Sequence, residues 1–133
     1  MIVIDPSVLI DLLKGTETPA TDRLQDLERD RILFSVPVPC YQEVLQGARD
    51  EKEWQILSEY LGSQYLLLSA DPISTHRGAS RIFYDCRRKG VTIRNSADCF
   101  IAQLVLEQDG VLLHDDEDFE RIRQVRPLKT MRA

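Results

Sequence analysis

Four acidic residues stand where a sheet of parallel strands would place a functional site. Asp5 directly follows an apolar run at residues 1–4, and Asp116 follows another at residues 111–113. Glu43 lies near the start of the helix expected after a second strand, and Asp98 opens a further helix. In an α/β protein each helix begins at the edge where the preceding strand ended, so all four carboxylates are expected at one edge of one sheet.

Four carboxylates at one edge favour the binding of a divalent cation. Two ionised carboxylates ~4 Å apart repel by about 4 kcal/mol at an effective dielectric constant near 20, so such a cluster needs cations or protons. Oxygen ligands with few nitrogen or sulfur donors suit Mg²⁺ or Mn²⁺, which can activate water toward a phosphoryl group. Asp118, in the acid-rich turn after residue 113, is a further candidate ligand. Taken singly, each acid is better explained as a helix cap or a solvated residue, so the metal interpretation depends on their coincidence.

Three residues beside these acids are candidates for contacting a substrate. Ser7 can hydrogen-bond a ligand or cap the first helix, and the sequence leaves both open. Arg94 precedes the helix that carries Asp98, where it can contact a phosphate or be simply exposed. His114 can meet a scissile phosphate, although a histidine at a strand end with no catalytic partner in sight is more often structural.

The stretch at residues 94–119 predicts the order helix, strand, helix. Apolar residues recur in it at helical spacing: Ala97, Phe100, Ile101, Leu104 and Val105. Asn95 or Ser96 can cap the start of this helix, and Gly110 is expected to stop it. The short apolar run at 111–113 predicts a buried strand.

The rest of the chain alternates strands with helices in the same way. Strands are expected at residues 1–4, 32–36, 66–68 and 128–130, and helices at residues 8–13, 19–27, 41–49, 54–61 and 72–89. No internal repeat or linker interrupts the pattern. The sequence therefore predicts a single α/β domain over residues 1–133 with a mostly parallel sheet.

Composition narrows the class of protein. Hydrophobic residues make up 43% and charged residues 29% of the 133 positions, as in an ordinary globular protein without a membrane-spanning segment. The three cysteines form no Cys-x-x-Cys pair and the two histidines have no cysteine or histidine at ligand spacing, which predicts reduced thiols and disfavours zinc. The net charge of −5 argues against general nucleic-acid binding unless the acids surround cations.

Four segments, taken together and in order, resemble the motifs of PIN-domain ribonucleases, and most closely those of the VapC toxins of bacterial toxin–antitoxin pairs. These segments lie at residues 5–13, 43–49, 94–102 and 113–119. The resemblance implies a three-layer α/β/α fold, Mg²⁺- or Mn²⁺-dependent endonucleolytic cleavage of RNA such as transfer or ribosomal RNA, a homodimer, and inhibition by a VapB-type antitoxin. It also implies that four acids bind the metal and are catalytic: Asp5, Glu43, Asp98 and Asp116. Asp118, Ser7 and Arg94 have supporting roles in this resemblance. His114 stands where many relatives carry threonine or serine.

A second class of function is compatible with the same residues. In it, the acids act as helix caps or as a docking site for a basic peptide or partner protein, and the domain has no catalytic activity. This binding module would keep its function with Asn in place of Asp98 and would gain no stability from metal, whereas the nuclease would lose activity and keep its fold. With either function the protein is expected in the cytoplasm, since the N-terminus lacks the features of a signal peptide.

Overall fold

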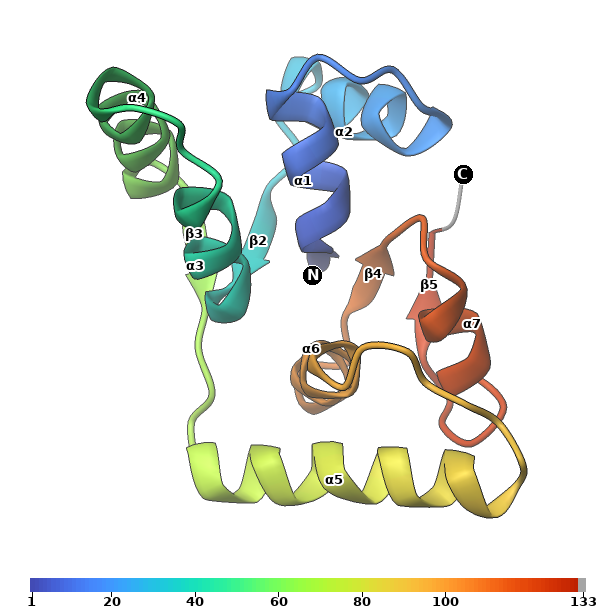
Figure 1. The fold of residues 1–133 in the computed structure, drawn as a ribbon. Helices are drawn as coiled ribbons and strands as arrows, with labels where there is room; N and C mark the ends of the chain where they lie inside the picture. The colour runs from blue at the N-terminus through green and yellow to red at the C-terminus, as the bar shows by residue number, and fades with distance from the viewer. Residues whose placement is uncertain (132–133) are drawn as a thin grey trace.

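In the computed structural model, which describes residues 1–131, five strands form one sheet in which every pairing is parallel (Figure 1). The strand order is β3-β2-β1-β4-β5. The strands are β1 (Ile2–Ile4), β2 (Phe34–Pro37), β3 (Tyr65–Leu67), β4 (Val111–Leu113) and β5 (Lys129–Thr130). The predicted parallel sheet is therefore confirmed. Residues 132 and 133, which belong to the predicted domain, lie outside the described residues.

Helices cover both faces of the sheet, which confirms the three-layer α/β/α architecture. They are α1 (Pro6–Leu13), α2 (Pro19–Arg29), α3 (Val38–Gln46), α4 (Glu51–Gly62), α5 (Pro72–Arg88), α6 (Ala97–Glu107) and α7 (Glu117–Ile122). Figure 1 shows α1 and α2 on one side of the strands and α5 and α6 on the other. The order of elements is the alternation that the sequence predicts.

Two hydrophobic cores follow from the alternation of side chains along the central strands. Val3 of β1 and Leu112 of β4 belong to the core that contains α5, α6 and α7. Their neighbours Ile4 and Leu113 belong to the core that contains α1 to α4. Because successive side chains of a strand point to opposite faces, these short strands must be apolar at nearly every position.

Side chains cap the starts of several helices, and one helix start differs from the prediction. Thr18 caps α2, and its side chain and that of Thr21 form a reciprocal capping box. Asp71 caps α5 by accepting a hydrogen bond from the Ser74 backbone N–H. The prediction that a helix spans residues 41–49 is wrong at its start, because α3 begins at Val38. Pro39 lies in its first turn, where a proline removes no hydrogen bond, so it opens a helix rather than closing a strand.

The two ends of α6 show how the local sequence sets the position of Asp98. At the start, the Asn95 side chain accepts a hydrogen bond of 3.0 Å from the Ala97 N–H, whereas the Ser96 side chain forms no cap. At the end, the left-handed residue is Asp109, with φ of 50°, and not the predicted Gly110. Gly110 instead allows close packing, since a Cβ there would lie 3.2 Å from the carbonyl oxygen of Met1, which precedes β1.

Cys40, Cys86 and Cys99 are buried free thiols, so the prediction of reduced, core-packing cysteines is confirmed. Burial raises the pKa of each thiol, which keeps the sulfur neutral. Within residues 1–131, the helices are all too short or too polar to serve as membrane spans.

Candidate metal centre

The candidate site lies at the topological switch point of the sheet, where the connections from two neighbouring strands pass to opposite faces. β1 lies between β2 and β4, and the helix after β1 packs on one face while the helix after β4 packs on the other. The residues that leave these two strands therefore meet at the carboxyl edge, the usual binding position in open α/β sheets. The Asp5 N–H donates to the Leu113 carbonyl oxygen at 3.0 Å, which joins the two strand ends at this point.

Asp5 is held in place by the first turn of α1. It is 3% exposed and forms the N-cap of this helix, with Pro6 in the first helical position. Its Oδ2 accepts hydrogen bonds from both the backbone N–H and the hydroxyl of Ser7. The pKa of Asp5 is raised to about 7, chiefly by burial and also by the charges of Asp116 and Glu43, although the Ser7 hydrogen bonds lower it.

Asp98 belongs to the first turn of α6 and lies close to Asp116 and Asp118 at the same edge. It is 6% exposed, and its Oδ2 is buried and receives no hydrogen bond from any residue in the described part of the chain. Burial, the charge of Asp5 and a hydrogen bond from protonated Asp98 to Asp118 together raise the pKa of Asp98 to about 9, and burial contributes most. A buried carboxylate oxygen without a donor is expected to bind a proton or a cation.

Asp116 and Asp118 bring two more carboxylates to this point from the start of α7. One carboxylate oxygen from each of Asp98, Asp116 and Asp118 lies within 4.8 Å of the others. Asp116 caps α7 by accepting a hydrogen bond of 2.9 Å from the Asp118 N–H. The three donors are all oxygen atoms, the ligand type that Mg²⁺ and Mn²⁺ prefer, so the residues present fit the predicted ion.

Asp118 also fixes the loop that leads into α6. It is 1% exposed, and its oxygens accept hydrogen bonds from the backbone N–H groups of Arg94, at 3.1 Å, and Asn95, at 3.0 Å. Arg121 adds a charged donor at 2.9 Å. Although burial alone would raise it, these donors hold the pKa of Asp118 below its ordinary value, so this carboxylate stays ionised. Asp118 therefore joins α7 to the loop before Asp98.

His114 is completely buried and has a partner at each ring nitrogen. Its Nδ1 accepts a hydrogen bond of 3.1 Å from the Asp116 backbone N–H, which places the proton of the neutral ring on Nε2. Nε2 lies 2.9 Å from Oε2 of Glu120 and donates to it. In this structure the ring holds the backbone of Asp116 in place, and its predicted contact with a phosphate stays a prediction.

The other predicted site residues lie around the acids at different depths. Glu43 is half-buried in the second turn of α3, and burial raises its pKa. Its charge acts on Asp5, although it lies outside the group of three close carboxylates. Ser7 is half-buried and bonded to Asp5, and the side chain of Arg94 is exposed. The structure thus gathers the predicted acids at one edge, while their individual catalytic and metal-binding roles stay predictions.

Sequence reasoning missed the residues that support this site. Glu120 bonds to His114 and Arg121 bonds to Asp118, and neither supporting residue belongs to a distinctive motif. The spacing of three between Asp118 and Arg121 is the one available signal, since residues three apart are neighbours on a helix. The bonds from Asp118 to residues 94 and 95 join segments far apart in the chain, and only the fold shows them.

Comparison with known proteins connects this geometry with a family. A family model described as the PIN domain matches residues 2–125. A VapC ribonuclease of Mycobacterium bovis and ribonuclease VapC11 of Mycobacterium tuberculosis are each 32% identical to the chain over 132 residues, covering 97% of this chain and 96% of the relative.

Solved structures share the fold at lower identity. A chain in the structure of VapBC2 from Rickettsia felis, bound to a DNA fragment from its promoter, matches with a TM-score of 0.75 and 14% identity, covering 100% of this chain and 99% of that one. A chain of VapBC-1 from nontypeable Haemophilus influenzae matches with a TM-score of 0.74 and 19% identity, covering 99% and 98%. These similarities concern the fold alone.

Proposed function

We propose a function for this chain from the premise that it belongs to the PIN-domain family. It is a metal-dependent endoribonuclease of the VapC type, the toxin of a toxin–antitoxin pair. Two relatives that match nearly its whole length are named ribonucleases. The proposed substrate is a structured RNA such as transfer or ribosomal RNA.

The observation that carries this proposal is a cluster of carboxylates at the sheet edge that is largely buried and lacks a hydrogen-bond donor for one of its oxygens. Asp98 has a buried oxygen without a donor, and two further carboxylates lie within 4.8 Å of it. Such an arrangement is unfavourable for a fold unless protons or cations neutralise it. A binding module that used these acids as caps would have no need to bury them together.

Each acid has a separate part in holding the ion. Asp98, Asp116 and Asp5 are the proposed ligands, with Glu43 at the outer side of Asp5. Ser7 orients the Asp5 carboxylate through two hydrogen bonds to a single oxygen. Asp118 gives most of its lone pairs to N–H donors, so we assign it chiefly to the alignment of Asp98 and Asp116.

When bound, Mg²⁺ or Mn²⁺ supplies Lewis acidity that activates water and offsets negative charge on a phosphate group. The exposed side chain of Arg94 is available to contact that phosphate. Its backbone is anchored by Asp118, so the guanidinium group extends from a fixed loop beside the acids. Burial of Asp5 and Asp98 strengthens their interactions with any bound charge.

The test is cleavage of total bacterial RNA by the purified chain with EDTA, Mg²⁺ or Mn²⁺. We expect metal-dependent cuts at a few defined sites. The D98N variant should make none, and D115N is the matched control because Asp115 is an exposed acid next to the cluster. Cleavage by folded D98N, or cleavage that EDTA does not stop, would refute the assignment. No cleavage by a folded chain with any metal would favour the binding module.

The proposal extends to two protein partners and to a location. The solved structures that match in fold are described as VapBC and FitAB assemblies, which supports a VapB-type antitoxin as the inhibitor of this chain. Adding its cognate antitoxin should abolish RNA cleavage, and a cut rate that stays unchanged would exclude inhibition. Homodimer formation is a further prediction, to be checked by light scattering of the purified chain. Cytoplasmic action remains a prediction from the sequence.

A further inference from the structure

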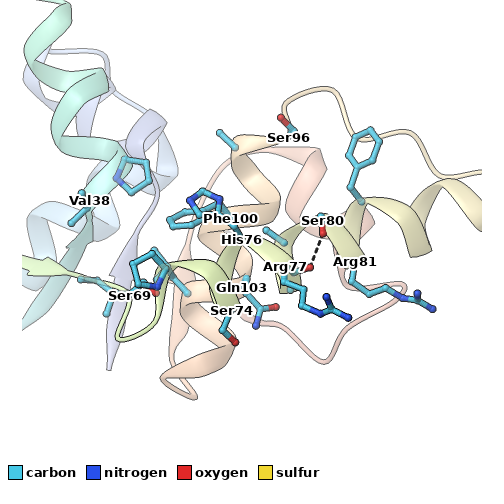
Figure 2. A pocket seen from close by; sticks show the side chains of 18 of the residues that line it. Val38, Ser69, Ser74, His76, Arg77, Ser80, Arg81, Ser96, Phe100 and Gln103 are labelled. Atoms are coloured by element: carbon cyan, nitrogen blue, oxygen red, sulfur yellow. Dashed lines mark hydrogen bonds between the residues drawn. The ribbon is translucent and has the colours of Figure 1, made fainter.

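A groove of about 1820 Å³ lies between α3 and β3 on one side and α5 and α6 on the other, as shown from close by in Figure 2. This volume exceeds that of a typical small-molecule pocket, roughly 300–1,000 Å³, so the groove has room for a segment of polymer. It differs from the carboxylate cluster in both charge and residue type. Nothing in the proposed function assigns a ligand to it.

The lining of the groove has a charge opposite to that of the protein. The chain has a net charge of −5, whereas the groove is lined by three arginines and one histidine and by no acidic residue. These residues all come from α5: His76, Arg77, Arg81 and Arg87. Concentration of cations in the groove of an acidic protein indicates an anionic ligand.

The three arginines differ in how freely they can meet a ligand. Arg81 is paired with Asp85 at 3.1 Å, and Arg87 lies over the ring of Phe83 at 5.5 Å. Arg77 is exposed and has no acidic side chain within salt-bridge distance among residues 1–131. It is therefore the cation best placed to bind an incoming phosphate.

Aromatic rings form a platform in the middle of the same groove. Figure 2 shows His76 against Phe100, and their ring centroids are 4.5 Å apart with an interplanar angle of 37°. Phe100 is half-buried and packs against the core beneath α6, so it supports the exposed ring of His76. A flat, supported and solvent-accessible ring is what an unpaired base requires for stacking.

Both walls of the groove contain residues that adjoin proposed site residues in the chain. Asn95, Ser96 and Ala97 line it, and the next residue of the chain is Asp98. On the opposite wall Tyr41 and Gln42 line it, and the next residue is Glu43. The groove is therefore lined by the segments that directly precede two of the proposed site residues, Asp98 and Glu43.

From these observations we propose that the groove binds an unpaired RNA segment next to the bond to be cut, with one base stacked on the His76–Phe100 pair and a phosphate at Arg77. The inference rests on the proposed nuclease function and names the form of its substrate, single-stranded at this point. Cations and stacking rings with no acid fit a polyanion that carries bases, and they disfavour a basic peptide. Binding here is sequence-tolerant, because every base has a face to stack.

The test measures binding without cleavage. Fluorescence anisotropy follows a short fluorescein-labelled oligouridylate, and separately a labelled RNA duplex, as the full chain is added in EDTA. Because no metal is present, the result does not depend on whether the protein is a nuclease. We expect the single strand to bind more tightly than the duplex. If the RNA-cleavage test fails while this test succeeds, the groove remains an RNA-binding site without the proposed activity.

Two variants separate charge from stacking, and each has a matched control. R77Q should reduce the dependence of log affinity on log salt by about 0.7, the value expected for one phosphate contact with a single strand. H76A should leave that slope unchanged and weaken binding by about five-fold or more, since stacking of one base contributes at least this much. R23Q and W54A alter an exposed arginine of α2 and an exposed ring of α4, and should bind like the parent.

Two results would overturn the proposal. One is an affinity and a salt slope for R77Q and H76A equal to those of the parent. The other is that R77Q and H76A bind RNA like the parent but differ from it in molar mass by light scattering. That result would assign this groove to an interface between two copies of the chain. His76 and Arg77 are exposed, so neither substitution removes a core contact, and circular dichroism can verify that both variants are folded.

Discussion

Replacement of Asp98 by asparagine should make the metal-free protein more stable. In the fold, burial and the charge of Asp5 raise the pKa of Asp98 to about 9, whereas an unfolded chain has the ordinary value of 3.8. Between these two values the folded protein keeps a proton that the unfolded chain releases. The contribution of Asp98 to the free energy of unfolding therefore falls as the pH rises from about 4 to about 9. Asparagine needs no proton, and its amide can donate to Asp118 as protonated Asp98 does.

The gain in the free energy of unfolding of D98N depends on the pH of the measurement. At pH 7, about 3 pH units above the ordinary pKa, taking up the proton costs the folded protein ~4 kcal/mol. At pH 5 the same cost is ~1.5 kcal/mol. Partial solvent access lowers both figures, so we expect D98N to gain about 2–4 kcal/mol at pH 7 and about 1 kcal/mol at pH 5. At pH 7 this corresponds to an increase in Tm of roughly 10 °C for a domain of this size.

Thermal and guanidinium unfolding of the parent and D98N, in EDTA at both pH values, measure this difference. D115N is the matched control, because Asp115 is exposed and its replacement removes a charge next to the cluster without removing a buried one. Added Mg²⁺ should then raise the Tm of the parent and of D115N, since a ligand of the folded state stabilises it by mass action, and should raise that of D98N much less.

Two outcomes would refute this reasoning. If D98N is less stable than the parent in EDTA at pH 7, Asp98 contributes a favourable contact and not an unfavourable protonation. If the gain is the same at pH 5 and pH 7, its cause is packing rather than ionisation. Equal stabilisation of D98N and the parent by Mg²⁺ would remove Asp98 from the metal site.

Three further predictions concern the metal and the residues behind it. The apparent affinity for Mg²⁺ should rise from about pH 6 to about pH 8, because burial holds protons on Asp5 and Asp98, with pKa values of about 7 and about 9. Titration calorimetry in buffers of different ionisation heat should detect the release of these protons on binding. An affinity that does not change with pH would contradict this prediction. D118N should lower stability by about 2–3 kcal/mol and speed hydrogen exchange at the Arg94 and Asn95 amides, whereas unchanged protection would show that Asp118 does not anchor them. H114L should cost about 1–3 kcal/mol in denaturant unfolding and expose the Asp116 amide to exchange; a stability equal to that of the parent would exclude a supporting role for His114.

The sequence allowed the fold and the gathering of the acids to be predicted because both depend on local patterns. Short apolar runs followed by acids, and helices opened by Asn95 or by Thr18 before Pro19, specify where each element begins. In a parallel sheet these starts share an edge, so four positions along the chain become neighbours without knowledge of any contact. The α3 boundary was mispredicted because proline ends a strand and opens a helix equally well.

The supporting contacts could not be predicted, because they depend on tertiary geometry. Nothing in the local sequence shows that Asp118 accepts hydrogen bonds from residue 94, or that His114 faces Glu120 and not solvent. The His76–Phe100 pair joins two helices across the groove, and helical periodicity gives no sign of it. Gly110 shows the same limit: the sequence suggests a helix stop, and the fold shows close approach of a strand.

The position of β1 in the sheet has a consequence for the timing of activity during synthesis. β1 lies at residues 2–4, whereas its partner β4 lies at residues 111–113, and the acids of the cluster extend to Asp118 in α7. A chain under synthesis can fold only the part that has emerged, so the carboxylate cluster cannot assemble before α7 is made. The nuclease activity proposed above would therefore appear only after α7 has emerged.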